Sequence, residues 1–250
     1  MDKGAQIGMW VIFAIAIIVV VALLFAIQKK PVPDQGIDYN PQSYIDGCTR
    51  KAVEEVVDKI LPQGGFLNPG YFKLYNGTKV IVLCESREFY KTCVSQHPML
   101  LNEIKGEILN YTLPRIEKCF DNLKAELEKT NAKVNYGLLT TSVDLGPERV
   151  YLNIKREVMI TKNEQSMKFE NFNVETVSPI YDLASIAVLI AGEEAKNCYF
   201  EYVGYELLHP SYKIDVFMFS DATRIYTLKD KDSGKIMNIA TRSCVIKPGI

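Results

Sequence analysis

The chain has 250 residues, of which 48% are hydrophobic and 24% are charged, and its formal net charge at pH 7 is −1. This composition is that of an ordinary globular protein and excludes a disordered or collagen-like chain. A near-neutral chain lacks the basic surface that nucleic-acid binding usually requires, so we predict no nucleic-acid partner.

The first predicted element is an uncharged apolar run from Ile7 to Ile27, which is followed by Lys29 and Lys30. In a helix this run spans roughly 30 Å, the hydrocarbon thickness of a bilayer. A cleaved signal peptide is the alternative, but its apolar region is shorter and ends in small residues. We therefore predict that residues 1–30 are a retained single-pass transmembrane anchor that contacts the lipid bilayer.

Residues 31–40 are predicted to be a linker, because Pro31 and Pro33 interrupt helical structure in a polar segment. After the linker, apolar residues recur every three or four positions, which predicts an amphipathic helix over 41–61. Asn40 is suited to cap this helix, and a proline follows at the first helical position.

A β-hairpin and a second helical stretch are expected next. Strands at 71–75 and 79–84 are separated by an Asn-Gly pair, the strongest two-residue turn signal. Residues 98–129 have helical periodicity and form either one long helix or two helices broken at Pro114. Residues 41–130 are thus predicted to be a helical subdomain with a hairpin.

Beyond residue 130 the apolar period changes to two, which is typical of strands. The predicted elements are strands at 134–145, 150–161 and 167–177, a helix at 180–196, and strands at 213–219, 223–228 and 236–245. Strands followed by a helix and more strands indicate an antiparallel sheet with a packed helix. We therefore predict an α+β fold, with residues 131–250 as its second subdomain.

The six cysteines form an even set, as a disulfide framework requires. Antiparallel helices at 41–61 and 98–128 would bring Cys48 beside Cys119. Cys84 and Cys93 close a short loop, and Cys198 and Cys244 both lie in the second subdomain, which suggests these three pairs. The alternative is that all six thiols are reduced, as they are in most cytosolic proteins.

Two sequons bear on the compartment. Asn76-Gly77-Thr78 and Asn110-Tyr111-Thr112 both fit the acceptor pattern for N-glycosylation. The lysines that flank the apolar run do not decide its orientation. Together with the even number of cysteines, the sequons favour an extracytoplasmic C-terminal domain, with Asn76 and Asn110 as candidate glycosylation sites.

Residues suited to catalysis are scarce. The chain contains two histidines, His97 and His209, and each precedes a proline, which predicts a turn or a loop. Cys93 and His97 have a metal-like spacing, but a zinc site needs three or four ligands and no second pair accompanies them. No common hydrolase, metalloprotease or nucleotide-binding motif occurs, so we predict no catalytic residue, cofactor or metal.

Three further motifs are better explained without function. Residues 230–234 resemble the start of a calcium loop but lack its glutamate, so a solvated hairpin turn is expected. Glu193 and Glu194 could act as paired carboxylates, yet they lie at the polar end of a predicted helix, where charge is expected. The Gln-Gly-Gly-Phe stretch at 63–66 reads as a helix stop rather than a binding loop.

Two stretches resemble known families. Lys3-Gly4-Ala5, followed by the apolar run, resembles the N-terminus of archaeal type IV pilin-like precursors, which implies peptidase cleavage between Gly4 and Ala5. The helix that ends in Gln-Gly-Gly-aromatic, together with residues 170–174, is similar to uncharacterised membrane-anchored proteins of small-genome (DPANN-type) archaea. That second resemblance implies no known activity.

These observations predict a single-pass protein of the cell membrane that is not an enzyme. Its extracytoplasmic domain is expected to bind a protein partner, to self-assemble, or to form part of the cell envelope. The first alternative is a type IV pilin-like filament subunit. The second is a membrane-tethered enzyme of unknown class.

Overall fold

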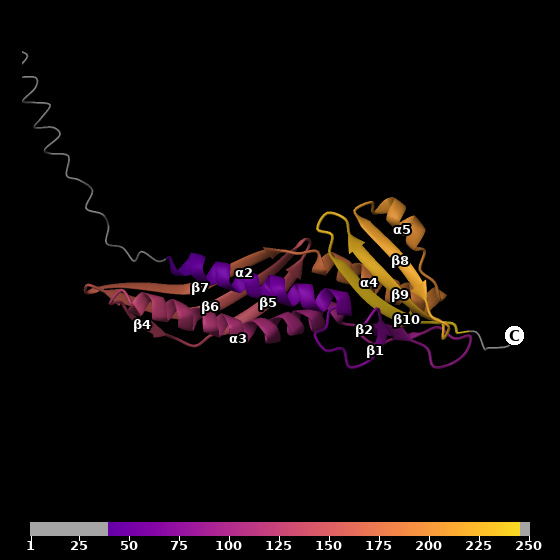
Figure 1. Cartoon of the computed structure of the whole chain (residues 1–250), viewed down its shortest axis with the longest axis horizontal. Coiled ribbons are helices and arrows are strands. Elements are labelled where there is room, and N and C mark those ends of the chain that lie inside the picture. Colours follow the sequence, from indigo (N-terminus) through magenta and orange to yellow (C-terminus); the bar gives the residue numbers. More distant parts are fainter. Residues whose placement is uncertain (1–39, 246–250) are drawn as a thin grey trace, which may run out of the picture. The chain divides into compact units, whose positions relative to one another are not determined.

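The computed structural model describes residues 40–245, which form an α+β fold as predicted (Figure 1). The predicted anchor and all but the last residue of the linker lie outside these residues. A search of the described helices found none with the length and apolar character of a membrane span.

Two long helices form one layer of the fold. Helix α2 (Pro41–Ile60) begins at Asn40, whose side chain accepts hydrogen bonds from the backbone amides of the first helical turn. Helix α3 (Leu100–Glu128) is continuous, which decides between the two alternatives left open by the sequence. Pro114 lies at an exposed position of α3, where its missing N–H costs one backbone hydrogen bond without ending the helix.

A four-stranded antiparallel sheet forms the second layer. Its long central strand β6 (Arg149–Lys162) pairs on one side with β7 (Gln165–Val177) and on the other with β4 (Lys133–Tyr136) and β5 (Thr140–Gly146). One strand was expected where β4 and β5 lie. The predicted strand is interrupted after β4, opposite a register shift in β6 between Lys155 and Val158.

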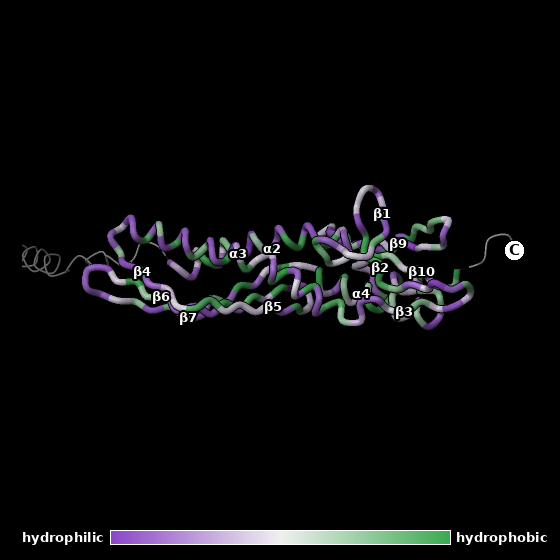
Figure 2. The backbone as a smooth tube through the Cα atoms, turned by 90° about the horizontal axis from the view of Figure 1, so that it is seen from below, coloured by the Kyte–Doolittle hydropathy of each residue, from purple (hydrophilic) through white to green (hydrophobic). Residues whose placement is uncertain are grey.

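Helices α2 and α3 cover one face of this sheet, and their apolar sides face the strands (Figure 2). Alternate residues of β6 and β7 are buried beneath them, among them Leu152, Ile154 and Phe172. The intervening residues point to solvent, which is the alternation expected of a sheet covered on one side.

The second sheet joins distant parts of the chain. Its strand order is β1 (Phe72–Tyr75), β2 (Thr78–Glu85), β10 (Ile236–Arg242), β9 (Thr223–Asp230) and β8 (Tyr212–Met218), and β3 (Val94–Ser95) also pairs with β2. The predicted hairpin at 71–84 and the last three predicted strands are therefore confirmed. All pairs are antiparallel except β2 with β10, which corrects the prediction of a purely antiparallel sheet.

The parallel β2–β10 pair also joins the two predicted subdomains. The β1–β2 hairpin comes from the segment 41–130, yet it completes the sheet of the C-terminal segment. Residues 40–245 accordingly belong to one compact unit.

Helix α4 (Ile180–Asn197), which was predicted nearly to its ends, packs on one face of this sheet. On the other face the Tyr75 ring lies 5.6 Å from the Phe217 ring, between centroids, although β1 and β8 are at opposite ends of the strand order. Tyr75 and Phe219 cover a buried cluster that includes Val80 and Ile225. The short helix α5 (Tyr202–Leu208) beside β8 was not predicted.

Candidate functional site

All six cysteines are paired, and the pairs are those suggested by the sequence: Cys48–Cys119, Cys84–Cys93 and Cys198–Cys244. The first bond links α2 to α3, which confirms that these helices are antiparallel neighbours. The second closes the loop between β2 and β3. The third ties the end of α4 to the segment that follows β10.

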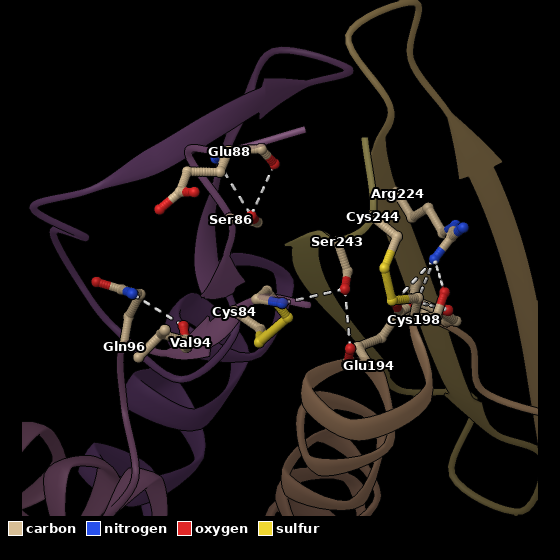
Figure 3. Close-up of a disulfide and its surroundings, with 12 residues drawn as sticks. Cys84, Ser86, Glu88, Val94, Gln96, Glu194, Cys198, Arg224, Ser243 and Cys244 are labelled. Atoms are coloured by element: carbon tan, nitrogen blue, oxygen red, sulfur yellow. Dashed lines mark hydrogen bonds and ion pairs between the residues drawn. A yellow bond between two sulfur atoms is a disulfide. The ribbon is translucent and has the colours of Figure 1, made fainter. Parts of the chain in front are cut away.

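A buried ionic cluster lies beside the third disulfide (Figure 3). The Glu194 carboxylate on α4 is 0% exposed and accepts hydrogen bonds from Arg224, at 2.7 and 2.8 Å, and from the Tyr226 hydroxyl, at 2.5 Å. The same Arg224 nitrogen donates to the Cys198 carbonyl oxygen at 2.7 Å. The cluster therefore joins β9 to the last turn of α4.

The burial of Glu194 corrects its interpretation as a solvated residue at the polar end of a helix. Glu193 remains partly exposed and accepts a hydrogen bond from Asn197, so the two carboxylates do not act as a pair. Burial, followed by the hydrogen bond to Glu194, raises the pKa of Tyr226 well above its ordinary value. The hydroxyl therefore stays protonated and serves as a hydrogen-bond donor.

Ser243 connects this cluster with the second disulfide (Figure 3). Ser243 is 2% exposed. Its hydroxyl donates a hydrogen bond to the Glu194 carbonyl oxygen at 2.8 Å and accepts one from the Cys93 amide at 3.2 Å. The neighbouring Cys244 amide donates to the Lys91 carbonyl oxygen at 2.9 Å. The residues after β10 are thus held on both sides, by α4 and by the β2–β3 loop.

An acidic cavity of about 530 Å³ lies at the other end of α4. Its carboxylates are Glu148, Asp182, Asp230 and Asp232, and none of its lining residues, all of them in the described chain, is Lys or Arg. Burial, followed by the charges of Asp182 and Asp230, raises the pKa of the lining residue Tyr212 to about 12. Four carboxylates line the cavity, and the nearby Lys231 ammonium donates a hydrogen bond to the carbonyl oxygen of the lining residue Pro210 at 2.6 Å.

Two segments that line the cavity, His209 and residues 230–234, were predicted to be a loop and a turn, and the structure confirms both. His209 follows α5, and residues 230–234 form the β9–β10 turn, in which Asp230 accepts a hydrogen bond from the Ser233 amide at 2.9 Å. No set of three or more His, Cys, Asp or Glu side chains within residues 40–245 is arranged to hold a metal ion. Sequence reasoning did not bring His209 and the 230–234 turn together, since α5 was not foreseen.

A groove of about 620 Å³ runs between α2 and α3 over the Cys48–Cys119 disulfide. Its charged lining residues are Lys51, Lys118, Arg115 and Glu55. The guanidinium of Arg115 lies 3.7 Å from the Glu55 carboxylate, which is also bonded to Lys59 at 2.6 Å. The amphipathic pattern locates both helices, but the sequence contains no signal for the groove.

The remaining predicted residues are structural or exposed. His97 Nδ1 lies 2.6 Å from Glu103 Oε2, and Cys93 is in a disulfide, so the pair does not ligate a metal together. Gly64 has φ +78° and ends the helical segment, as the Gly-Gly pair predicted. A Cβ on Gly64 would lie 2.7 Å from the Asn238 carbonyl oxygen, so this position also needs glycine for packing against β10.

Asn76 and Asn110 are both exposed, the first in the β1–β2 turn and the second on α3. Gly4 and Ala5, the candidate cleavage site, lie outside the described residues. No known protein family, curated protein or solved structure matches the chain.

Proposed function

We propose that the protein is a single-pass membrane-anchored protein whose disulfide-bonded head lies outside the cytoplasm and acts without catalysis, as a surface binding protein or an envelope component. The observation that carries the proposal is the set of three disulfides, which uses all six cysteines. Disulfides persist in oxidising compartments and are rare in the cytosol.

The anchor in this proposal is the apolar run from Ile7 to Ile27, whose length fits a bilayer. The resemblance to membrane-anchored proteins of small-genome archaea belongs to the same proposal. Within the head, the side chains that would be most reactive, a buried carboxylate and the cysteines, are used in contacts that stabilise the fold. Glu194 is committed to Arg224 and Tyr226, and the cysteines are committed to one another. This arrangement supports a structural or binding role.

Two measurements on the full chain test the proposal. In intact cells, an external protease should degrade a C-terminally tagged head while the anchor remains in the membrane. Under denaturing conditions without reductant, an alkylating reagent should label no cysteine, and after reduction it should label all six. A head that is protected until the cells are lysed, or thiols that react without reductant, would contradict the proposal.

A pilin-like filament subunit is the second candidate, and Gly4-Ala5 before the apolar run is the observation that favours it. Sequencing of the mature N-terminus distinguishes the two candidates. A mature chain that starts at Ala5, with filaments visible by electron microscopy, would support the filament subunit. A mature chain that retains Met1 to Gly4 would favour the first candidate, the anchored surface protein.

A further inference from the structure

We propose that Asn76 carries an N-linked glycan and that Asn110, in an equally good sequon, does not. This inference rests on the proposed extracytoplasmic position of the head. It concerns a distinction that the sequence cannot make, because Asn76-Gly77-Thr78 and Asn110-Tyr111-Thr112 fit the same pattern. The two sites differ in local structure, and that difference decides which one a glycosyltransferase can use.

Asn76 lies at the tip of a two-residue hairpin turn. Tyr75, the last residue of β1, pairs with Thr78, the first residue of β2, so only Asn76 and Gly77 form the loop. Both have positive φ, +48° and +79°, which is the backbone of a type I′ turn and projects the loop away from the sheet. Asn76 is exposed, and the Thr78 hydroxyl has no hydrogen-bond partner within residues 40–245.

Asn110 is exposed too, but its sequon is built into the middle of α3. Residues i and i+2 of a helix point in directions about 200° apart, so the acceptor amide and the sequon hydroxyl face opposite sides. Thr112 is 0% exposed, and its hydroxyl donates to the Ile108 carbonyl oxygen at 2.8 Å.

Presenting this second sequon would require α3 to unwind where it packs on α2. The Cys48–Cys119 disulfide holds the two helices together within two to three turns of Asn110. The Tyr111 side chain adds a further link, since its hydroxyl is 2.5 Å from the Glu55 carboxylate of α2. Asn76 needs no such unfolding, because it lies in an exposed turn and Thr78, the first residue of β2, is partly exposed.

The transfer requires a co-reactant, which we take to be an oligosaccharide carried on a lipid phosphate or diphosphate. The Asn76 amide nitrogen forms a bond to the anomeric carbon, and the bond from that carbon to the phosphate oxygen breaks. The amide gives up one proton, and the lipid phosphate departs with the bonding electron pair. No oxidant or reductant takes part.

A glycan at this turn would also protect an exposed strand. β1 is the end strand of its sheet, and its outward-facing residues Phe72 and Leu74 are 38% and 59% exposed. Apolar end strands pair readily with other chains, and proteins commonly block them with charge, proline or a covering segment. A bulky hydrophilic chain two residues beyond Leu74 would hinder such pairing.

The test uses the full chain, produced in cells that demonstrably N-glycosylate a secreted control protein, and peptide mass spectrometry after proteolysis. We expect a saccharide mass on the Asn76 peptide and none on the Asn110 peptide. Asn76→Gln and Thr78→Ala should both abolish the modification, while Asn110→Gln should leave it unchanged. Thr78→Ala is the informative variant, because it keeps the acceptor amide and removes the sequon hydroxyl together with one methyl group.

The outcomes separate this inference from the proposed function. An unmodified Asn76 in a head that external protease degrades would overturn the inference alone, as would a glycan on Asn110. A head that is inaccessible from outside the cell would overturn both. The protective role is checked by size-exclusion chromatography. Asn76→Gln should elute at a larger apparent size than the wild type, and Leu74→Lys in the same background should restore the wild-type elution.

Discussion

The buried pair of Glu194 and Arg224 yields the sharpest prediction. Arg224→Met removes the only cationic partner that the structure, over residues 40–245, gives the Glu194 carboxylate. Removing one partner of a buried ion pair costs about 3–5 kcal/mol, because the other charge stays buried without compensation. Glu194 is 0% exposed, but the Arg224 side chain is 23% exposed, so water can reach part of the vacated space. We therefore expect a loss of about 3 kcal/mol.

The assay is urea unfolding of the oxidised full chain in detergent, followed by circular dichroism at pH 7. Arg149→Met is the matched control, because it removes the same side chain from an exposed pair with Glu175 at 3.1 Å. Exposed pairs contribute about 0–1 kcal/mol, so the control should change stability by less than about 1 kcal/mol.

A double variant separates the effect of charge from the effect of packing. Replacing both Glu194 and Arg224 by Met removes the uncompensated charge, and such apolar replacements of buried pairs are often neutral. The double variant should therefore be more stable than Arg224→Met alone. If Arg224→Met were no more damaging than Arg149→Met, or if the double variant were the least stable of all, the reasoning would be refuted.

Three further changes test other parts of the fold by the same urea assay. Replacing Cys48 and Cys119 together by Ala should cost about 4 kcal/mol, because their bond spans 71 residues and limits the unfolded chain; a change under about 1 kcal/mol would argue against the bond. Gly64→Ala should cost about 2 kcal/mol or more, since φ is +78° and a β10 carbonyl blocks the added Cβ, whereas Gly47→Ala, with open space in α2, should stabilise by up to about 1 kcal/mol. Burial opposes the ionisation of Asp221, but hydrogen bonds from a lysine and from a backbone amide outweigh it and lower its pKa to about 2 from the ordinary 3.8. The stabilisation is therefore present above about pH 4 and lost as the pH falls towards 2, so Asp221→Asn should destabilise by less than about 1 kcal/mol at pH 7 and not at pH 2; an equal effect at both pH values would contradict this assignment.

Local signals in the sequence predicted most of the elements. The cap at Asn40, the Asn-Gly turn and the apolar periods located α2, the β1–β2 hairpin and α4 close to their observed ends. The Cys48–Cys119 pair followed from placing the two helices antiparallel, the Cys84–Cys93 pair from the short loop that it closes, and the Cys198–Cys244 pair from the shared subdomain. The cap, the turn and the apolar periods each involve residues that are near in sequence or that lie on one regular element, where backbone geometry alone fixes the spacing.

The features that the sequence did not reveal depend on distant contacts. A period of two marks a strand but not its partner, so nothing in β2 indicated a parallel neighbour in β10. The sequence around Glu194 is typical of an exposed helix end. The burial of Glu194 depends on hydrogen bonds from Arg224 and Tyr226 of β9, which are distant in sequence. The acidic cavity likewise needs four separate segments to meet.

The parallel pairing of β2 with β10 constrains the order in which the protein can fold. Val82 pairs with Ala240, so the second sheet cannot be completed until β10 has been synthesised. Contacts between residues so far apart in sequence close a long loop, which slows folding. Until β10 arrives, β2 exposes an edge on an unfinished intermediate, and such intermediates aggregate. If the head is exported across a membrane, as proposed above, each new chain would pass through this aggregation-prone stage.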